Sequence, residues 1–164
     1  MMTNLTDTRS YWNATAESPD FPRLSSDIDV DIAIVGGGIV GITTARFLKD
    51  RGLTVAVVEA RRIGRQVTGK STAKVSSQHG LIYQKLERNF GEESARLYGE
   101  AQETAIHKIE QLASTYQIDC DIEAKAAFIY TREEEHVSAL EKEVEVAQRL
   151  GLPATARSQD RFAL

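Results

Sequence analysis

The chain has 164 residues, of which 41% are hydrophobic and 27% are charged, and its formal net charge is −4. This balance is typical of a folded domain rather than a disordered chain, and the acidic charge gives no electrostatic basis for binding nucleic acid or an anionic membrane. A single cysteine, Cys120, excludes an internal disulfide and a paired-cysteine metal site, and we predict no metal centre.

Residues 1–27 contain prolines and many polar residues without a sustained period, and we expect them to form an extended N-terminal arm. Tyr11 and Trp12 are expected to attach this arm to the body of the protein, because large aromatic side chains gain most from burial. The first residues lack the basic segment and apolar run of a secretory signal. We therefore expect a cytoplasmic protein without a membrane partner.

Residues 28–80 are predicted to contain a strand, a glycine turn, a helix and a second strand. The strands are the apolar runs VDIAIV (30–35) and LTVAVVE (53–59), and the helix extends from Ile39 to about Asp50, before Gly52. Such a βαβ unit has parallel strands and a right-handed crossover. Residues 60–80 are expected to form a long polar loop, and loops of this length are often functional.

Residues 81–164 are predicted to be mainly helical. Ile82, Leu86 and Phe90 recur at helical spacing. A longer helix follows, and its inward stripe is predicted to be Ala95, Tyr98, Ala101, Ala105, Ile109, Leu112 and Tyr116. The run AAFIYT (126–131) predicts a strand.

The last predicted helix begins where Thr131 and Glu134 have the spacing of a capping box, and it ends at Gly151 and Pro153. Its inward residues are predicted to be Val137, Leu140, Val144 and Ala147.

The glycine turn between the two predicted strands has the pattern G-x-G-x-x-G. Gly36 permits the tight turn, Gly38 allows a pyrophosphate to approach the backbone, and Gly41 allows the helix to pack closely on the strand. The free N–H groups and the dipole at the helix start favour a diphosphate. Glu59 ends the second strand, where a carboxylate can accept both ribose hydroxyls of an adenosine. This pattern predicts a dinucleotide site.

A second motif, GRQVTGKS (64–71), matches the string of a nucleotide-triphosphate P-loop. Its context differs, because no strand leads directly into it and the residues after it are poor helix formers. We therefore favour the dinucleotide site. The charge of Glu59 disfavours NADP, although Arg61 and Arg62 weaken that argument, and the glycine fingerprint alone does not separate FAD from NAD.

The stretch from Val30 to Tyr83 closely resembles the N-terminus of FAD-dependent oxidoreductases of the D-amino-acid oxidase and glycine oxidase type. It is most similar to the bacterial branch that carries a C-terminal Rieske domain, although the cysteine and histidine ligands of that domain are absent here. The resemblance implies FAD as cofactor. It also implies a loop of small residues that folds back over the flavin. The implied cofactor-binding residues are Gly36, Gly38, Ile39, Val40, Gly41, Glu59, Ala60, Arg61, Thr68, Gly69, Lys70, Ser71, Thr72 and Ala73.

The expected fold class is α/β, with a Rossmann-like FAD-binding βαβ unit and cofactor loop in residues 28–80. A helix-rich α+β segment in residues 81–164 would begin the substrate domain of an incomplete fold. The resemblance implies oxidation of a small amine or amino-acid-like substrate by hydride transfer to FAD. The alternatives are an inactive binding or interaction fragment and an NAD-dependent dehydrogenase. No catalytic residue is assigned.

Overall fold

The computed structural model describes residues 9–17 and 19–157, and these fall into two compact units that are divided between Lys74 and Val75. The described residues form helices and one small parallel sheet.

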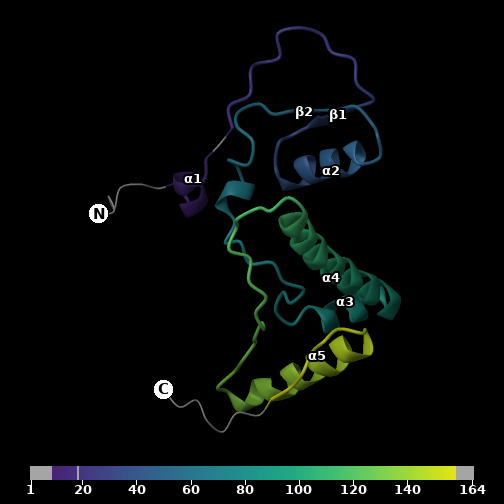
Figure 1. Ribbon diagram of the computed structural model, residues 1–164. Coiled ribbons are helices and arrows are strands. Elements are labelled where there is room, and N and C mark those ends of the chain that lie inside the picture. Colours follow the sequence, from purple (N-terminus) through teal and green to yellow (C-terminus); the bar gives the residue numbers. More distant parts are fainter. Residues whose placement is uncertain (1–8, 18, 158–164) are drawn as a thin grey trace, which may run out of the picture. The chain divides into compact units, whose positions relative to one another are not determined.

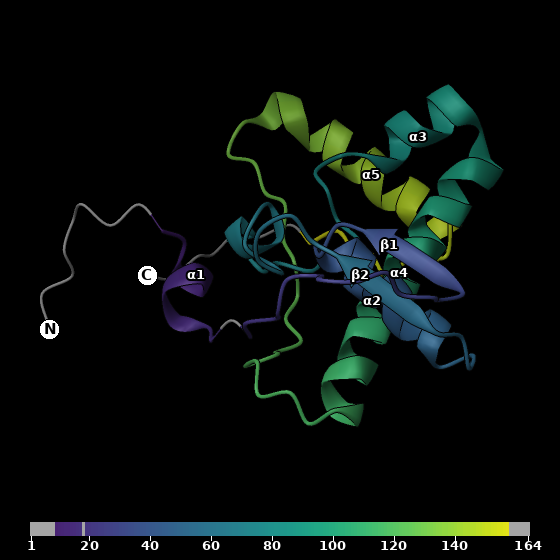
Figure 2. The same cartoon turned by 90° about the horizontal axis from the view of Figure 1, so that it is seen from above.

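The first unit is built on a strand–helix–strand arrangement (Figure 1). Strand β1 (Ile32–Val35) pairs in parallel with β2 (Val55–Val58), and Ile32 lies opposite Val55. Helix α2 (Ile39–Lys49) connects them and packs against the pair, as Figure 2 shows from above. The predicted βαβ order is therefore present, with both strands shorter than their apolar runs.

This unit also contains two short helical segments, one in the N-terminal arm and one within the polar loop. Within the arm that we expected to be extended, α1 (Tyr11–Thr15) forms a short helix. In the loop, Thr68–Lys70 form a single 3-10 turn, η1. No described hydrophobic side chain in this unit is buried, so polar contacts have a large part in its organisation.

The described part of the second unit contains three α-helices: α3 (Tyr83–Phe90), α4 (Glu92–Thr115) and α5 (Val137–Arg149). Helix α3 packs on both α4 and α5. The small core consists of Tyr83, Ala95, Val146, Ala147 and Leu150. The phenol of Tyr83 donates a 2.6 Å hydrogen bond to the Ser77 carbonyl, and burial raises the pKa of Tyr83 to about 12.

A buried carboxylate joins α5 to the start of α3. Glu143 is only 7% exposed, and its two oxygens accept hydrogen bonds from the backbone N–H groups of Tyr83, at 2.7 Å, and Gln84, at 3.0 Å. The first N–H groups of a helix have no partner within the helix, and a negative charge near them is favourable. Glu143 therefore caps α3 from a distant part of the chain.

The substitution Glu143→Ala is expected to lower the free energy of unfolding by about 2 kcal/mol, because it leaves one buried and one partly buried N–H donor without an acceptor. Urea unfolding followed by circular dichroism measures this loss. Glu141→Ala, at an exposed position of the same helix, is the control and should change stability by less than about 0.5 kcal/mol. Equal stability of the two variants would contradict the capping role.

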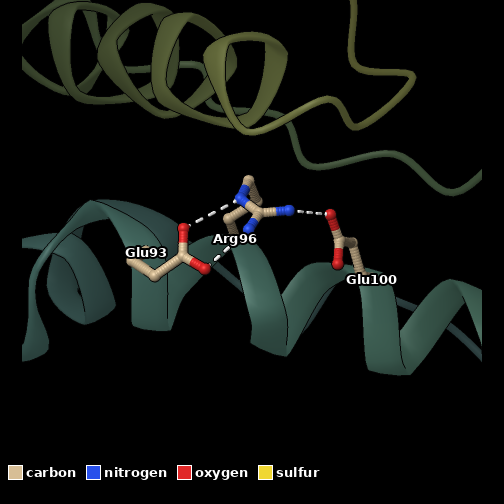
Figure 3. Close-up of polar contacts among 3 residues, drawn as sticks. All are labelled: Glu93, Arg96 and Glu100. Atoms are coloured by element: carbon tan, nitrogen blue, oxygen red, sulfur yellow. Dashed lines mark hydrogen bonds and ion pairs between the residues drawn. The ribbon is translucent and has the colours of Figure 1, made fainter.

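An ion-pair cluster lies on the exposed surface of α4 (Figure 3). The Arg96 guanidinium contacts Glu93, at 2.6 Å, and Glu100, one turn to either side along the helix. These carboxylates raise the pKa of Arg96. Exposed pairs of this spacing contribute little to stability, so the cluster supports α4 only locally.

The predicted strand at residues 126–131 is wrong. These residues form no strand or bridge, and Phe128 and Tyr130 are both 74% exposed. A run of β-branched and aromatic residues indicates strand propensity, but a strand also needs a neighbour for its backbone hydrogen bonds. Within the described part of the chain, this run has none.

The predicted capping box is also wrong. The Thr131 hydroxyl accepts a hydrogen bond from the N–H of Glu133, at 3.1 Å, instead of bonding with Glu134. This is a local turn, because the bond joins residues only two apart. A 3-10 turn, η2 (Glu134–His136), follows it before α5 begins.

The inward stripes are correct only in part. Ala95 of α4 and Ala147 of α5 are buried as predicted. Four positions that were predicted to face inward are instead exposed: Ala101, Ala105, Tyr116 and Val137. Helical periodicity locates an apolar face, but it does not show how much of that face a neighbouring element covers.

Candidate functional site

The glycine turn after β1 has a geometry that glycine alone accommodates at two positions. Gly36 has a φ of 112°, and its N–H donates a 2.8 Å hydrogen bond to the Val58 carbonyl, which extends the pairing of the strands. A Cβ atom on Gly41 would lie 2.0 Å from the Gly36 carbonyl oxygen. The first turn of α2 is thus packed directly on the backbone of the glycine turn.

The polar loop reaches the start of α2. Gly38 is the N-cap residue, and the next N–H, of Ile39, donates a 3.0 Å hydrogen bond to the hydroxyl of Thr68. A Cβ on Gly38 would lie 3.3 Å from the same hydroxyl oxygen. Two motifs that are about thirty residues apart in the sequence therefore meet at one helix N-terminus.

Glu59 lies beside the same turn. Its carboxylate accepts hydrogen bonds from the N–H groups of Gly37, at 2.8 Å, and Arg61, at 2.9 Å. These two backbone bonds hold the pKa of Glu59 below its usual value, and the bond from Gly37 has the larger effect. Each carboxylate oxygen can accept a further bond, so Glu59 keeps the capacity to accept two hydroxyl groups.

The other predicted residues lie in the same unit. Val40, Ala60, Arg61, Lys70 and Thr72 are exposed, and Gly69 is buried. Among the described residues, the N–H groups of Gly38, Val40 and Gly41 meet no hydrogen-bond acceptor. The start of α2 therefore combines free donors, a glycine cradle and a carboxylate, which are the groups that a dinucleotide needs.

The loop after the 3-10 turn has two local features that the sequence did not indicate. Ala73 has a φ of 59°, a conformation that is uncommon for a residue with a side chain. Its N–H donates a 3.1 Å hydrogen bond to the hydroxyl of Ser71.

The P-loop interpretation has no support in the structure. Residues 71–82 contain no helix, whereas a P-loop leads directly into one. The N–H of Gly64, the first glycine of that string, donates a 2.9 Å bond to the Gly37 carbonyl. The string therefore packs on the first glycine turn.

Sequence reasoning missed several residues that shape this site. Gly37 is buried, and a Cβ there would lie 2.9 Å from Cγ1 of Ile63. Arg65 and Asn13 contact one another between the loop and α1. The run of three glycines was a possible signal for the close contact of Gly37 with Ile63. No spacing in the sequence connects Arg65 with Asn13.

Comparison with known proteins agrees with this geometry. Residues 31–163 match the family described as FAD dependent oxidoreductase. The chain is 41% identical over 143 residues to YhfW of Bacillus subtilis, which is named as a Rieske 2Fe-2S iron–sulfur protein; the match covers 87% of this chain and 28% of that protein. It is 30% identical over 145 residues to gamma-glutamylputrescine oxidoreductase of Escherichia coli, covering 88% of this chain and 34% of that protein.

A shorter match, 43% identical over 56 residues, is to pseudooxynicotine dehydrogenase of a Pseudomonas species, and it covers 32% of this chain and 11% of that protein. No solved structure matches the chain. The chain spans about a third of the length of the first two relatives. None of its described helices has the length and apolar character needed to cross a membrane.

The chain belongs to the FAD-dependent oxidoreductase family, whose members bind FAD.

Proposed function

We propose that this chain, as a member of the FAD-dependent oxidoreductase family, forms the FAD-binding N-terminal part of an enzyme that oxidises a small amine or amino-acid-like substrate. One observation carries the proposal: the Thr68 hydroxyl lies 3.0 Å from the backbone nitrogen of Ile39, which brings the polar loop to the glycine turn and supports a shared site. Relatives named for gamma-glutamylputrescine and pseudooxynicotine support a small organic substrate.

In this proposal the site is Rossmann-like, and each group binds a defined part of the cofactor. The turn from Gly36 to Gly41 and the start of α2 bind the pyrophosphate, and Glu59, beside Ala60 and Arg61, accepts the hydroxyls of the adenosine ribose. The loop from Thr68 to Ala73 lies against the flavin side of the molecule. Lys70, which is exposed on this loop, offsets phosphate charge.

When bound, the flavin supplies the hydride acceptor, because such chemistry belongs to the cofactor rather than to amino-acid side chains. The residues of this chain bind and orient the cofactor, and they supply no assigned acid or base. The partner is a small molecule, and the cytoplasmic location stays a prediction.

A comparison of nucleotides tests the choice of cofactor. We expect FAD at a hundred times its Kd to stabilise the protein by about 2.7 kcal/mol, because a ligand that binds only the folded state shifts the unfolding equilibrium. Differential scanning calorimetry measures this shift, with NAD and magnesium–ATP at the same concentration as controls. Stabilisation by NAD alone would indicate a dehydrogenase, and stabilisation by magnesium–ATP alone would indicate a P-loop. Either result would contradict the proposal.

A further inference from the structure

The short helix α1 is attached to the polar loop through the loop's backbone carbonyl groups. Three side chains at its start donate hydrogen bonds to carbonyl oxygens of residues 65–71. These bonds run from the Ser10 hydroxyl to Gly69, from the Trp12 indole N–H to Ser71 at 2.8 Å, and from the Asn13 amide to Arg65 at 3.4 Å. Each joins residues more than fifty positions apart in the sequence.

Arg65 makes the reverse connection from the loop to α1. One guanidinium nitrogen donates to the backbone carbonyl of Asn13, at 2.6 Å, and to its side-chain oxygen, at 3.3 Å. The other donates to the carbonyl of Ala16, at 3.2 Å, at the end of α1. A planar guanidinium suits this arrangement because its donors point in fixed directions.

The two segments also fit closely in shape. Gly69 is buried at their contact, and a Cβ there would lie 2.4 Å from the side-chain oxygen of Asn13 and 2.4 Å from the Gly64 carbonyl. Glycine is therefore required at this position for α1 to approach the loop, independently of any contact with a cofactor.

Helix α1 has no stability of its own. It contains five residues, none of them buried, and a helix of this length does not form alone in water. Trp12 remains 40% exposed, so burial contributes only part of its attachment. The contacts with residues 65–71 stabilise α1, and the same contacts restrict the position of the loop.

These contacts with α1 use none of the loop side chains that are expected to meet FAD. The Thr68 hydroxyl is directed at Ile39, and the Lys70 side chain is exposed. The α1 residues bond to carbonyl oxygens on the loop, groups that would repel a phosphate if they faced it.

We propose that Ser10, Trp12, Asn13 and Arg65 form a clamp that positions the loop from Thr68 to Ala73 for FAD. The clamp rests on the proposed function, and its residues are positioning residues that act through the loop. Ordering the loop before binding removes an entropic cost from the binding step, so an intact clamp raises the affinity for FAD.

Hydrogen exchange in the FAD-free protein tests the clamp without relying on activity. The N–H groups of Lys70 and Ser71 are bonded within the 3-10 turn, at 3.1 and 3.2 Å. Arg65→Gln is expected to speed their exchange about tenfold and to weaken FAD binding by a similar factor, as loss of a charged hydrogen bond would. The amides of α2 should keep their exchange rates, which shows that the unit remains folded.

Arg23→Gln is the matched control, because it removes the same charge from an exposed arginine of the same unit, and it should change neither rate nor affinity. Arg65→Lys should recover part of both effects. Faster exchange with unchanged FAD affinity would overturn the role in binding and leave the proposed function intact. Unchanged exchange in Arg65→Gln and Asn13→Ala would overturn the clamp itself. A wild-type chain that binds no FAD would overturn the proposed function, and with it the role of the clamp in binding.

Discussion

Replacing Gly41 with alanine is expected to lower the free energy of unfolding by about 3 kcal/mol, at the upper end of the cost of overpacking. The added Cβ would lie 2.0 Å from the Gly36 carbonyl oxygen, and a backbone atom at a tight turn has little freedom to move away. The helix would have to separate from the turn, which would also displace the free N–H groups that are proposed to bind the pyrophosphate.

Fluorescence of Trp12, the single tryptophan, measures unfolding of the unit that contains the site. Thr44→Ala is the control, because it changes an exposed position of the same helix without adding volume. A Gly41→Ala protein that is as stable as this control, and that binds FAD equally well, would contradict the close packing of α2 on the turn.

The second large effect is expected at Glu59. Glu59→Ala should weaken FAD binding about a hundredfold, because it removes both oxygens that are proposed to accept the ribose hydroxyls. Glu59→Gln keeps one carbonyl oxygen and should have a smaller effect. Equilibrium titration with FAD measures both, and Glu17→Ala, an equal charge change at an exposed position, should bind as the wild type does.

The pH dependence of FAD binding gives an independent check of Glu59. Hydrogen bonds from Gly37 and Arg61 lower the pKa of its carboxyl from 4.5, so the carboxylate persists in the folded protein below that pH. Its contribution is complete above pH 4.5 and is lost as the pH falls through the lowered pKa. Affinity that is independent of Glu59, in both variants and at every pH, would contradict its proposed role.

The sequence was sufficient to predict the βαβ order, because local signals agree with one another there. Two apolar runs flank a glycine turn, and Gly52, with a φ of 82°, follows the helix end as expected. The meeting of the two glycine motifs was predicted only through the family resemblance. No periodicity in the loop from Ala60 to Gly80 indicates that Thr68 reaches the N–H of Ile39.

The errors share a physical cause, since each depends on a partner that local sequence does not specify. The run from Ala126 to Thr131 has strand propensity without a neighbouring strand among the described residues. Arg65 lies in a polar loop where nothing marks it as a contact of Asn13, fifty-two residues away. Contacts between distant segments depend on the packed structure, so composition and spacing do not reveal them.

We propose that the glycine turn, Glu59 and the polar loop of this chain together hold FAD. The most direct test is the visible absorption spectrum of the purified protein, recorded before and after denaturation and again after addition of FAD. We expect a yellow chromophore that is released on denaturation and identified as FAD, with one molecule bound per chain. A colourless protein that neither takes up added FAD nor gains thermal stability from it would contradict the claim.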